Sequence, residues 1–206
     1  MDIKKINRMK VFIIAFAIIA SSGLCLAQTT TNVEGSQFEF KEVVRHDASP
    51  VESQGRTGTC WSFSALSFLE SEIMRVNKTD KPIVLSEMFI VRKAYEAKAK
   101  KYIRMDGRTN FGQGGAFHDI PYVIKNYGIV PQNVYTGLKK KTDTYNHSEM
   151  FNQLNEIVSN AKSEGKGIQQ SWVESYNKVL DENIGELPET FKFKGEKYTS
   201  QSFYKS

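Results

Sequence analysis

Apolar residues recur at helical spacing in three segments of the first two thirds of the chain. The spacing predicts helices over residues 61–76, from Ser86 to about residue 102, and over residues 117–127. Ser86 is expected to cap the second helix, and Gly128 to end the third. The apolar stripes of the first two helices are Phe63, Leu66, Leu69, Ile73 and Met74, and Met88, Val91, Tyr95, Ala99 and Tyr102.

The later part of the chain repeats the same helical pattern twice. Residues 147–162 and 171–184 each carry one apolar face, and the glycine-containing stretch 163–167 separates them. Short alternating apolar and charged residues around Gly195 predict a small hairpin after residue 191. The sequence therefore predicts a mainly helical protein with a pair of packed helices in its second half.

The first 27 residues have the pattern of a secretory signal peptide. Four basic residues lie within residues 1–10, an apolar run fills residues 11–20, and small residues lead to a cleavage pattern at Cys25-Leu26-Ala27. The apolar run is shorter than the ~20 residues of a membrane-spanning helix, so no stable membrane anchor is expected. We expect export to the periplasm or the medium.

Removal of this segment changes the charge of the protein. The segment contains four of the 28 basic residues and one of the 23 acidic residues, which leaves 24 against 22 and a net charge near +2. Basic and acidic residues are interspersed in the remaining chain, so nucleic acid is not expected as a partner.

Cys60 is the single cysteine that remains after residue 27. It cannot form an internal disulfide, which leaves an intermolecular bridge, a buried thiol or a reactive nucleophile. Cys60 lies where the first long helix begins, and unpaired N–H groups and the helix dipole favour a thiolate there. Gln54, six residues earlier, carries an amide that could join the Cys60 N–H around an oxyanion. We therefore interpret Cys60 and Gln54 as candidate catalytic residues.

Four ordered motifs give the chain a resemblance to a known family. They are the run from Gln54 to Ser64, Leu85-Ser86-Glu87-Met88, Gly112-Gln113-Gly114-Gly115, and Asn126-Tyr127-Gly128-Ile129-Val130-Pro131. Together they resemble the papain-like cysteine peptidases, and within them the bleomycin hydrolase and aminopeptidase C group. Typical papain enzymes have a further cysteine three residues before the nucleophile, where this chain has Thr57.

The resemblance implies an α+β papain-like fold, of which this chain carries mainly the helical N-terminal domain with helical inserts and lacks the β-rich second domain. Residues 28–206 would form an incomplete peptidase domain: a nucleophile-bearing helical core over 38–137, a helical insert over 138–190, and the start of a truncated remainder over 191–206. The resemblance also implies peptide substrates, no metal or organic cofactor, and for the complete enzyme a possible homo-oligomer, a hexamer.

Gly114 and Gly115 are the candidate substrate-binding residues. In papain-like enzymes a matching glycine pair brings extended backbone beside the substrate, where N–H and C=O groups pair with the peptide in strand fashion. The alternative is an ordinary loop that needs positive φ. The position of the pair between the second and third predicted helices matches the family order and favours substrate contact.

The expected catalytic base is missing from the chain. Papain-like sequences place a histidine and then an asparagine about 130 to 150 residues after the cysteine, and residues 191–206 contain neither. His46, His118 and His147 are more simply surface or capping residues, and His118 is the least improbable substitute because its loop should approach the cleft. A helix N-terminus stabilises an anion by only ~0.3 to 1 kcal/mol and cannot protonate a leaving amine.

These observations favour the N-terminal fragment of an exported cysteine aminopeptidase that is inactive alone because it lacks the downstream histidine and asparagine. Two alternatives stay open. One is a non-catalytic papain-like module that binds peptides, and the other is a cysteine acyltransferase with another base.

Overall fold

The computed structural model of the chain describes residues 34–38, 40–140, 143–163, 165 and 171–206. The predicted signal peptide, residues 1–27, lies outside these residues. The chain divides into two units, Met1–Arg45 and His46–Ser206. The described residues of the first unit form turns and irregular chain, and all helices and strands reported below belong to the second.

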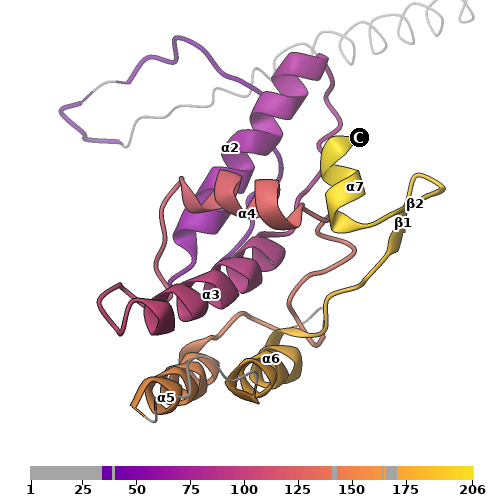
Figure 1. Cartoon of the computed structure of the whole chain (residues 1–206). Coiled ribbons are helices and arrows are strands. Elements are labelled where there is room, and N and C mark those ends of the chain that lie inside the picture. The colour runs from indigo at the N-terminus through magenta and orange to yellow at the C-terminus, as the bar shows by residue number, and fades with distance from the viewer. Residues whose placement is uncertain (1–33, 39, 141–142, 164, 166–170) are drawn as a thin grey trace, which may run out of the picture. The chain divides into compact units, whose positions relative to one another are not determined.

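The second unit is mainly helical (Figure 1). Its elements in chain order are α2 (Cys60–Asn77), α3 (Glu87–Arg104), α4 (Asp119–Tyr127), α5 (Ser148–Ser163), α6 (Ser171–Ile184), β1 (Phe191–Phe193), β2 (Glu196–Tyr198) and α7 (Ser200–Lys205). The five long helices fall where the apolar spacing predicts them, with ends that differ by one or two residues.

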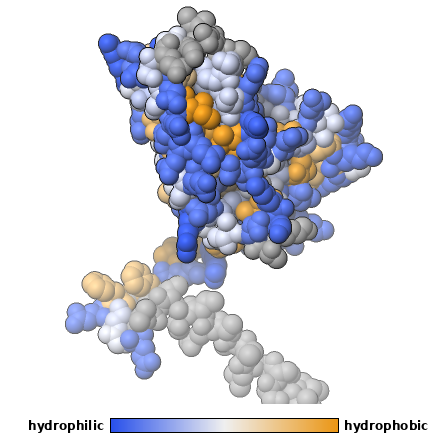
Figure 2. Space-filling model, turned by 90° about the horizontal axis from the view of Figure 1, so that it is seen from below, coloured by the Kyte–Doolittle hydropathy of each residue, from blue (hydrophilic) through white to orange (hydrophobic). Residues whose placement is uncertain are grey.

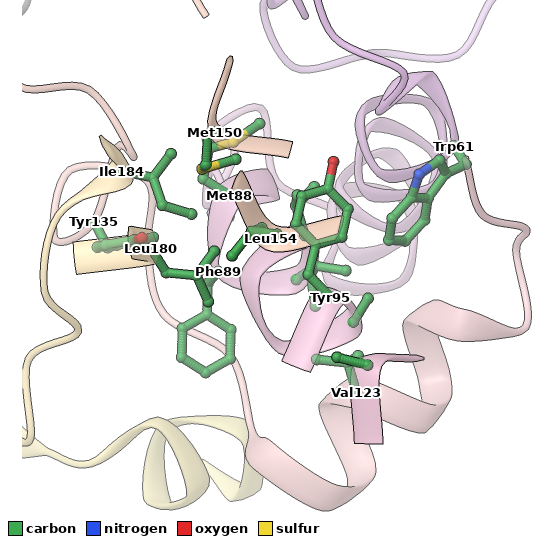
Figure 3. Packing of buried hydrophobic residues seen from close by; sticks show 14 of the residues in the cluster. Trp61, Met88, Phe89, Tyr95, Val123, Tyr135, Met150, Leu154, Leu180 and Ile184 are labelled. Carbon is green, nitrogen blue, oxygen red and sulfur yellow. The ribbon is translucent and has the colours of Figure 1, made fainter. Parts of the chain in front are cut away.

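Helix α3 lies at the centre of this unit and contacts α2, α4, α5 and α6. Its predicted stripe is buried, since Met88, Val91, Tyr95 and Ala99 are each fully enclosed. Figure 3 shows side chains from the other four helices gathered around it, among them Trp61, Val123, Leu154 and Leu180. The helices α2 and α4 therefore share one continuous core with the pair α5 and α6.

The ends of the two central helices follow from local chemistry. The Ser86 hydroxyl accepts a hydrogen bond from the Phe89 N–H at 3.0 Å, which confirms Ser86 as the N-cap of α3. The same hydroxyl donates to the Tyr135 carbonyl at 2.6 Å and so ties the start of α3 to the loop after α4. Helix α4 ends at Gly128, whose φ of 80° is incompatible with a continuing α-helix.

The hairpin β1–β2 forms as predicted, and α7 is an element that the apolar pattern did not predict. Phe191 pairs with Tyr198, and the turn residues Lys194 and Gly195 have φ of 49° and 90°, as a type I′ turn requires. Helix α7 begins with a capping box between Thr199 and Ser202. The Ser200 hydroxyl donates to the Tyr127 carbonyl at 2.7 Å, which fastens α7 to the end of α4.

Hydrophilic residues cover most of the face of the second unit drawn in Figure 2, and apolar residues show in small patches between them. Two aromatic residues that remain exposed, Phe68 of α2 and Phe117 before α4, meet edge to face with ring centroids 6.0 Å apart. In the part of the chain that the structure describes, no helix is both long and apolar enough to cross a membrane.

Candidate active site

Cys60 is the first residue of α2 and is exposed. Its backbone N–H has no hydrogen-bond partner among the described residues, because the helical bonds at this end begin with Ser62 and Phe63 donating to the Thr59 carbonyl. The thiol thus has the position that the sequence predicts, beside the unpaired donors of a helix N-terminus. An anion that forms next to the sulfur would find the Cys60 N–H free.

The loop that carries Gln54 turns tightly in front of α2. The Gln54 side-chain Nε2 donates to the Thr57 carbonyl at 2.5 Å, and the Thr57 hydroxyl donates back to the Gln54 carbonyl at 2.9 Å. A glutamine amide has two N–H donors, so this bond occupies one and leaves the second. The structure therefore gives Gln54 a role in shaping the loop that the sequence did not reveal.

Residues 145–147 bind the same loop through backbone hydrogen bonds. The Arg56 N–H donates to the Tyr145 carbonyl at 2.7 Å, and the His147 N–H donates to the Arg56 carbonyl at 3.4 Å. Gly55 has φ of 58°, and a Cβ there would collide with the Tyr145 backbone. The loop before Cys60 consequently depends on residues that follow it by about ninety positions.

Residues 112–115, called the glycine loop below, contact the start of α2. The Trp61 indole Nε1 donates to the Gln113 carbonyl at 3.0 Å, and the Gly58 N–H donates to the Gln113 side-chain oxygen at 2.9 Å. Trp61 is 7% exposed and packs in the core next to Cys60 in the chain. The role of Gln113 was not predicted: it bonds to Gly58 and Trp61, the residues on either side of Thr59 and Cys60. The motif Gly112-Gln113-Gly114-Gly115 contains Gln113 but does not indicate these bonds.

The two candidate glycines differ from one another. Neither has a positive φ, so a loop conformation reserved for glycine does not explain the pair. A Cβ on Gly115 would lie 2.6 Å from carbons of the Trp61 ring and 2.9 Å from the Asp119 carboxylate, whereas nothing lies within 4 Å of a Cβ on Gly114. Close packing therefore requires glycine at position 115. No steric contact requires glycine at position 114.

Their backbone groups differ as well. The Gly114 carbonyl accepts a hydrogen bond from the Lys98 ammonium at 2.7 Å, and the Ala116 N–H donates to the Asp119 carboxylate at 2.9 Å. The N–H and C=O of Gly115 have no partner within the described residues, and Gly115 is exposed. Of the predicted pair, Gly115 is the one that keeps both backbone groups available for an extended peptide.

Gly115→Ala is expected to lower the free energy of unfolding by about 1 to 3 kcal/mol, because the added methyl group overlaps the buried Trp61 ring. Gly114→Ala is the matched control and should change it by less than about 0.5 kcal/mol. Urea denaturation of both variants measures the difference. Equal losses at the two positions would contradict this packing.

The three histidines do not supply a base to Cys60. His118 is exposed, and its ring Nε2 lies 3.7 Å from the carboxylate of the adjacent Asp119. His46 is exposed in the chain that precedes the Gln54 loop. Among the described residues, no histidine has a hydrogen bond or ring contact with Cys60.

His147 corrects an expectation from the sequence, because it is not a surface residue. It is 2% exposed, its Nδ1 lies 3.4 Å from the Tyr95 hydroxyl, and its Nε2 has no partner in the described part of the chain. Burial lowers the pKa of His147 to about 4. Its carbonyl accepts the Phe151 N–H at 2.8 Å, so the expected position at the start of a helix is correct.

The glycine loop also lines a cavity of about 1260 Å³. The C-terminal half of α3 lines it with Lys98, Lys101 and Arg104, and the loop and α4 add Gly114, Gly115 and Asp119. Cys60 does not line this cavity. Across the described ranges, no group of three or more histidine, cysteine and acidic side chains has the arrangement that a metal ion needs.

Comparison with known proteins gives matches over most of the chain. Residues 35–199 match the family described as papain family cysteine protease. Bleomycin hydrolase of Rattus norvegicus is 26% identical over 221 residues, and that of Homo sapiens is 23% identical over 219 residues; each match covers 92% of this chain and 48% of the relative. The chain thus spans about half the length of these curated relatives.

Two further matches concern one short segment and the fold. The oryzain beta chain of Oryza sativa subsp. japonica is 34% identical over 88 residues, which cover 42% of this chain and 16% of that protein. The crystal structure of PepW from Lactobacillus rhamnosis HN001 superposes with a TM-score of 0.59 at 20% identity, and covers 79% of this chain and 44% of that one. These matches confirm the predicted papain-like fold, with the helical N-terminal portion present. The chain belongs to the papain family of cysteine proteases and is similar within it to the bleomycin hydrolases.

Proposed function

We propose that this chain is the nucleophile-bearing part of an exported cysteine aminopeptidase, with Cys60 as the nucleophile. The observation that carries the proposal is the placement of Cys60: an exposed thiol at the first residue of α2, whose backbone N–H has no partner in the described part of the chain. The glycine loop is bonded to the very next residue, Trp61, so a peptide held along that loop would lie beside the sulfur.

The proposed chemistry is acyl transfer to sulfur. The Cys60 thiolate attacks the carbonyl carbon of the peptide, and the carbonyl oxygen becomes an oxyanion held by the Cys60 N–H and the second N–H of the Gln54 amide. The C–N bond then breaks, the amine leaves with a proton, and an acyl thioester remains. Water hydrolyses the thioester and restores the thiol.

This sequence of steps needs a proton donor and acceptor that the described residues do not place at Cys60. In the proposal a histidine oriented by an asparagine supplies it from a part of the protein outside this sequence. The length of the bleomycin hydrolases, about twice that of the matched region, supports this view. In this proposal the N–H and C=O of Gly115 form hydrogen bonds with the backbone of the bound peptide. Gly114, the residue before it, also contacts the peptide.

Export and assembly belong to the same proposal. Export to the periplasm or the medium rests on the charged, apolar and small-residue pattern of residues 1–27. Peptides are the proposed partners, and association of complete subunits into a hexamer is proposed from the family resemblance alone.

The purified chain of residues 28–206 is expected to hydrolyse aminoacyl fluorogenic amides at a negligible rate. The product of the complete coding sequence should hydrolyse them, and Cys60→Ala should abolish this activity. Release of the fluorophore with time measures all three proteins. Robust turnover by residues 28–206 that disappears in Cys60→Ala would refute the need for a base from outside this sequence.

A module that binds peptides without cleaving them is the second candidate. It is favoured by one observation: Gly115 keeps its N–H and C=O free, while no histidine in the described part of the chain contacts Cys60. Peptide binding by the complete product without any release of amine would favour this candidate over the peptidase.

A further inference from the structure

Lys98 of α3 connects three parts of the candidate site. Its ammonium donates to the Gly114 carbonyl at 2.7 Å and lies 3.7 Å from the Asp119 carboxylate. The same nitrogen lies 4.9 Å from the centre of the Trp61 ring, within the range of a cation–π contact. One cation therefore meets the glycine loop, the start of α4 and the residue after Cys60.

Lys98 differs from the other basic residues at the same end of α3. Its side chain is only 18% exposed, whereas Lys100, Lys101 and Arg104 are exposed. Holding a lysine in one conformation costs up to about 2 kcal/mol of side-chain entropy. Burial also lowers the pKa of Lys98, and the Asp119 carboxylate opposes that change. The three contacts of Lys98 offset these costs and hold its side chain in one position in the site.

The contacts of Lys98 determine which backbone groups of the loop are free. Four bonds hold the loop: Trp61 to the Gln113 carbonyl, Gly58 to the Gln113 side chain, Lys98 to the Gly114 carbonyl, and Ala116 to the Asp119 carboxylate. They hold the chain on both sides of Gly115, whose N–H and C=O have no partner within the described ranges. Without the Lys98 bond, the Gly114–Gly115 peptide plane would be free to rotate.

We propose that Lys98 is a positioning residue for peptide binding, which fixes the Gly114–Gly115 peptide plane against Trp61 so that the Gly115 N–H faces a peptide at a set distance from Cys60. The Gly115 C=O lies in the next peptide plane, which the bond from the Ala116 N–H to the Asp119 carboxylate holds. This inference rests on the proposed function, since it assumes that a peptide lies along the loop. It assigns the residue no contact with the reacting atoms.

The test compares two alkylating reagents on the purified chain. A dipeptidyl chloromethyl ketone must lie along the loop before it reacts with Cys60, whereas iodoacetamide needs only the thiol. Lys98→Met should raise the half-saturating concentration of the peptide reagent by about tenfold and leave the iodoacetamide rate within about twofold. Lys98→Arg keeps a cation with several donors and should restore most of the loss.

Lys101→Met, on the same helix, is the matched control and should behave as the parent chain. Thermal melts of all variants establish that each is folded. The proposal is overturned if Lys98→Met leaves saturation unchanged, if it slows both reagents equally, if Lys98→Arg behaves as the methionine variant, or if the parent chain shows no saturation. Failure of the complete product to hydrolyse amides would refute the proposed function and leave this labelling result standing, so the two are distinguishable.

Discussion

Replacing Arg92 by methionine is expected to lower the free energy of unfolding by about 3 kcal/mol. Arg92 of α3 is 5% exposed, and it donates to the Gly185 carbonyl and to the Asp181 carboxylate, each at 2.6 Å. Its Nε also lies 3.3 Å from the Glu96 carboxylate. Methionine fills much of the same volume but leaves these acceptors without their cation.

The loss belongs at the lower end of the range for buried ion pairs because the Asp181 side chain is 35% exposed and can regain water. Urea denaturation measures the change. Lys178→Met is the matched control: it breaks an exposed pair with Glu182 on the same helix as Asp181, and should cost no more than about 0.5 kcal/mol. A loss below about 1 kcal/mol for Arg92→Met would show that Arg92 does not hold α6 against α3.

A second large effect is expected in the pH dependence of stability, where two buried groups act in opposite directions. Burial lowers the pKa of His147 from 6.5 to about 4. Burial raises the pKa of Glu87 from 4.5 to about 7, and the nearby carboxylates of Glu70 and Glu52 add to the rise. The Glu87 Oε2 atom is buried without a hydrogen-bond partner among the described residues, which agrees with a neutral carboxyl group.

Between pH 4.5 and 6.5 the unfolded chain binds a proton at His147 that the folded chain does not, so this group makes stability rise with pH. Glu87 does the reverse in the same window: the folded protein holds a proton that the unfolded chain has lost, so this group makes stability fall as pH rises. Each slope is about 1.4 kcal/mol per pH unit. The two contributions largely cancel in the parent protein.

Single variants should reveal the two slopes separately. Across this window, stability relative to the parent should rise with pH by about 2 to 3 kcal/mol in Glu87→Gln, and should fall by a similar amount in His147→Asn. Urea titrations at several pH values measure the slopes, which do not depend on the absolute loss that either substitution causes. Parallel pH profiles for the parent and both variants would contradict the burial of these two groups in the states described.

Helix positions could be predicted from the sequence because each long helix buries one stripe of apolar residues. Leu66 and Met74 of α2, and Leu154 and Val158 of α5, recur at helical spacing and are buried as that spacing requires. The cap at Ser86 was equally local, since its partner is three residues away. Helix α7 escaped prediction because it is six residues long and is held by a bond to Tyr127, which lies 73 positions earlier.

The candidate site could be predicted only in part, for the same reason. The place of Cys60 at a helix start follows from neighbouring residues. The bonds of Gln113 and the contacts of Lys98 depend on how separate segments of the chain meet. The bond of Gln54 to Thr57 is local, but it lies in an irregular turn that no periodicity encodes. His147 was predicted to be a surface or capping residue; it does precede a helix, yet its side chain lies against Tyr95 in the core.

Cys60, as the proposed nucleophile of a papain-type peptidase, should carry the acyl group of the substrate during turnover. The product of the complete coding sequence is mixed with an aminoacyl ester, quenched in acid within the first turnover, and mapped by peptide mass spectrometry. The account predicts an acyl thioester on the peptide that contains Cys60, and none in Cys60→Ala. An acyl group on another residue, or undiminished turnover in Cys60→Ala, would contradict it.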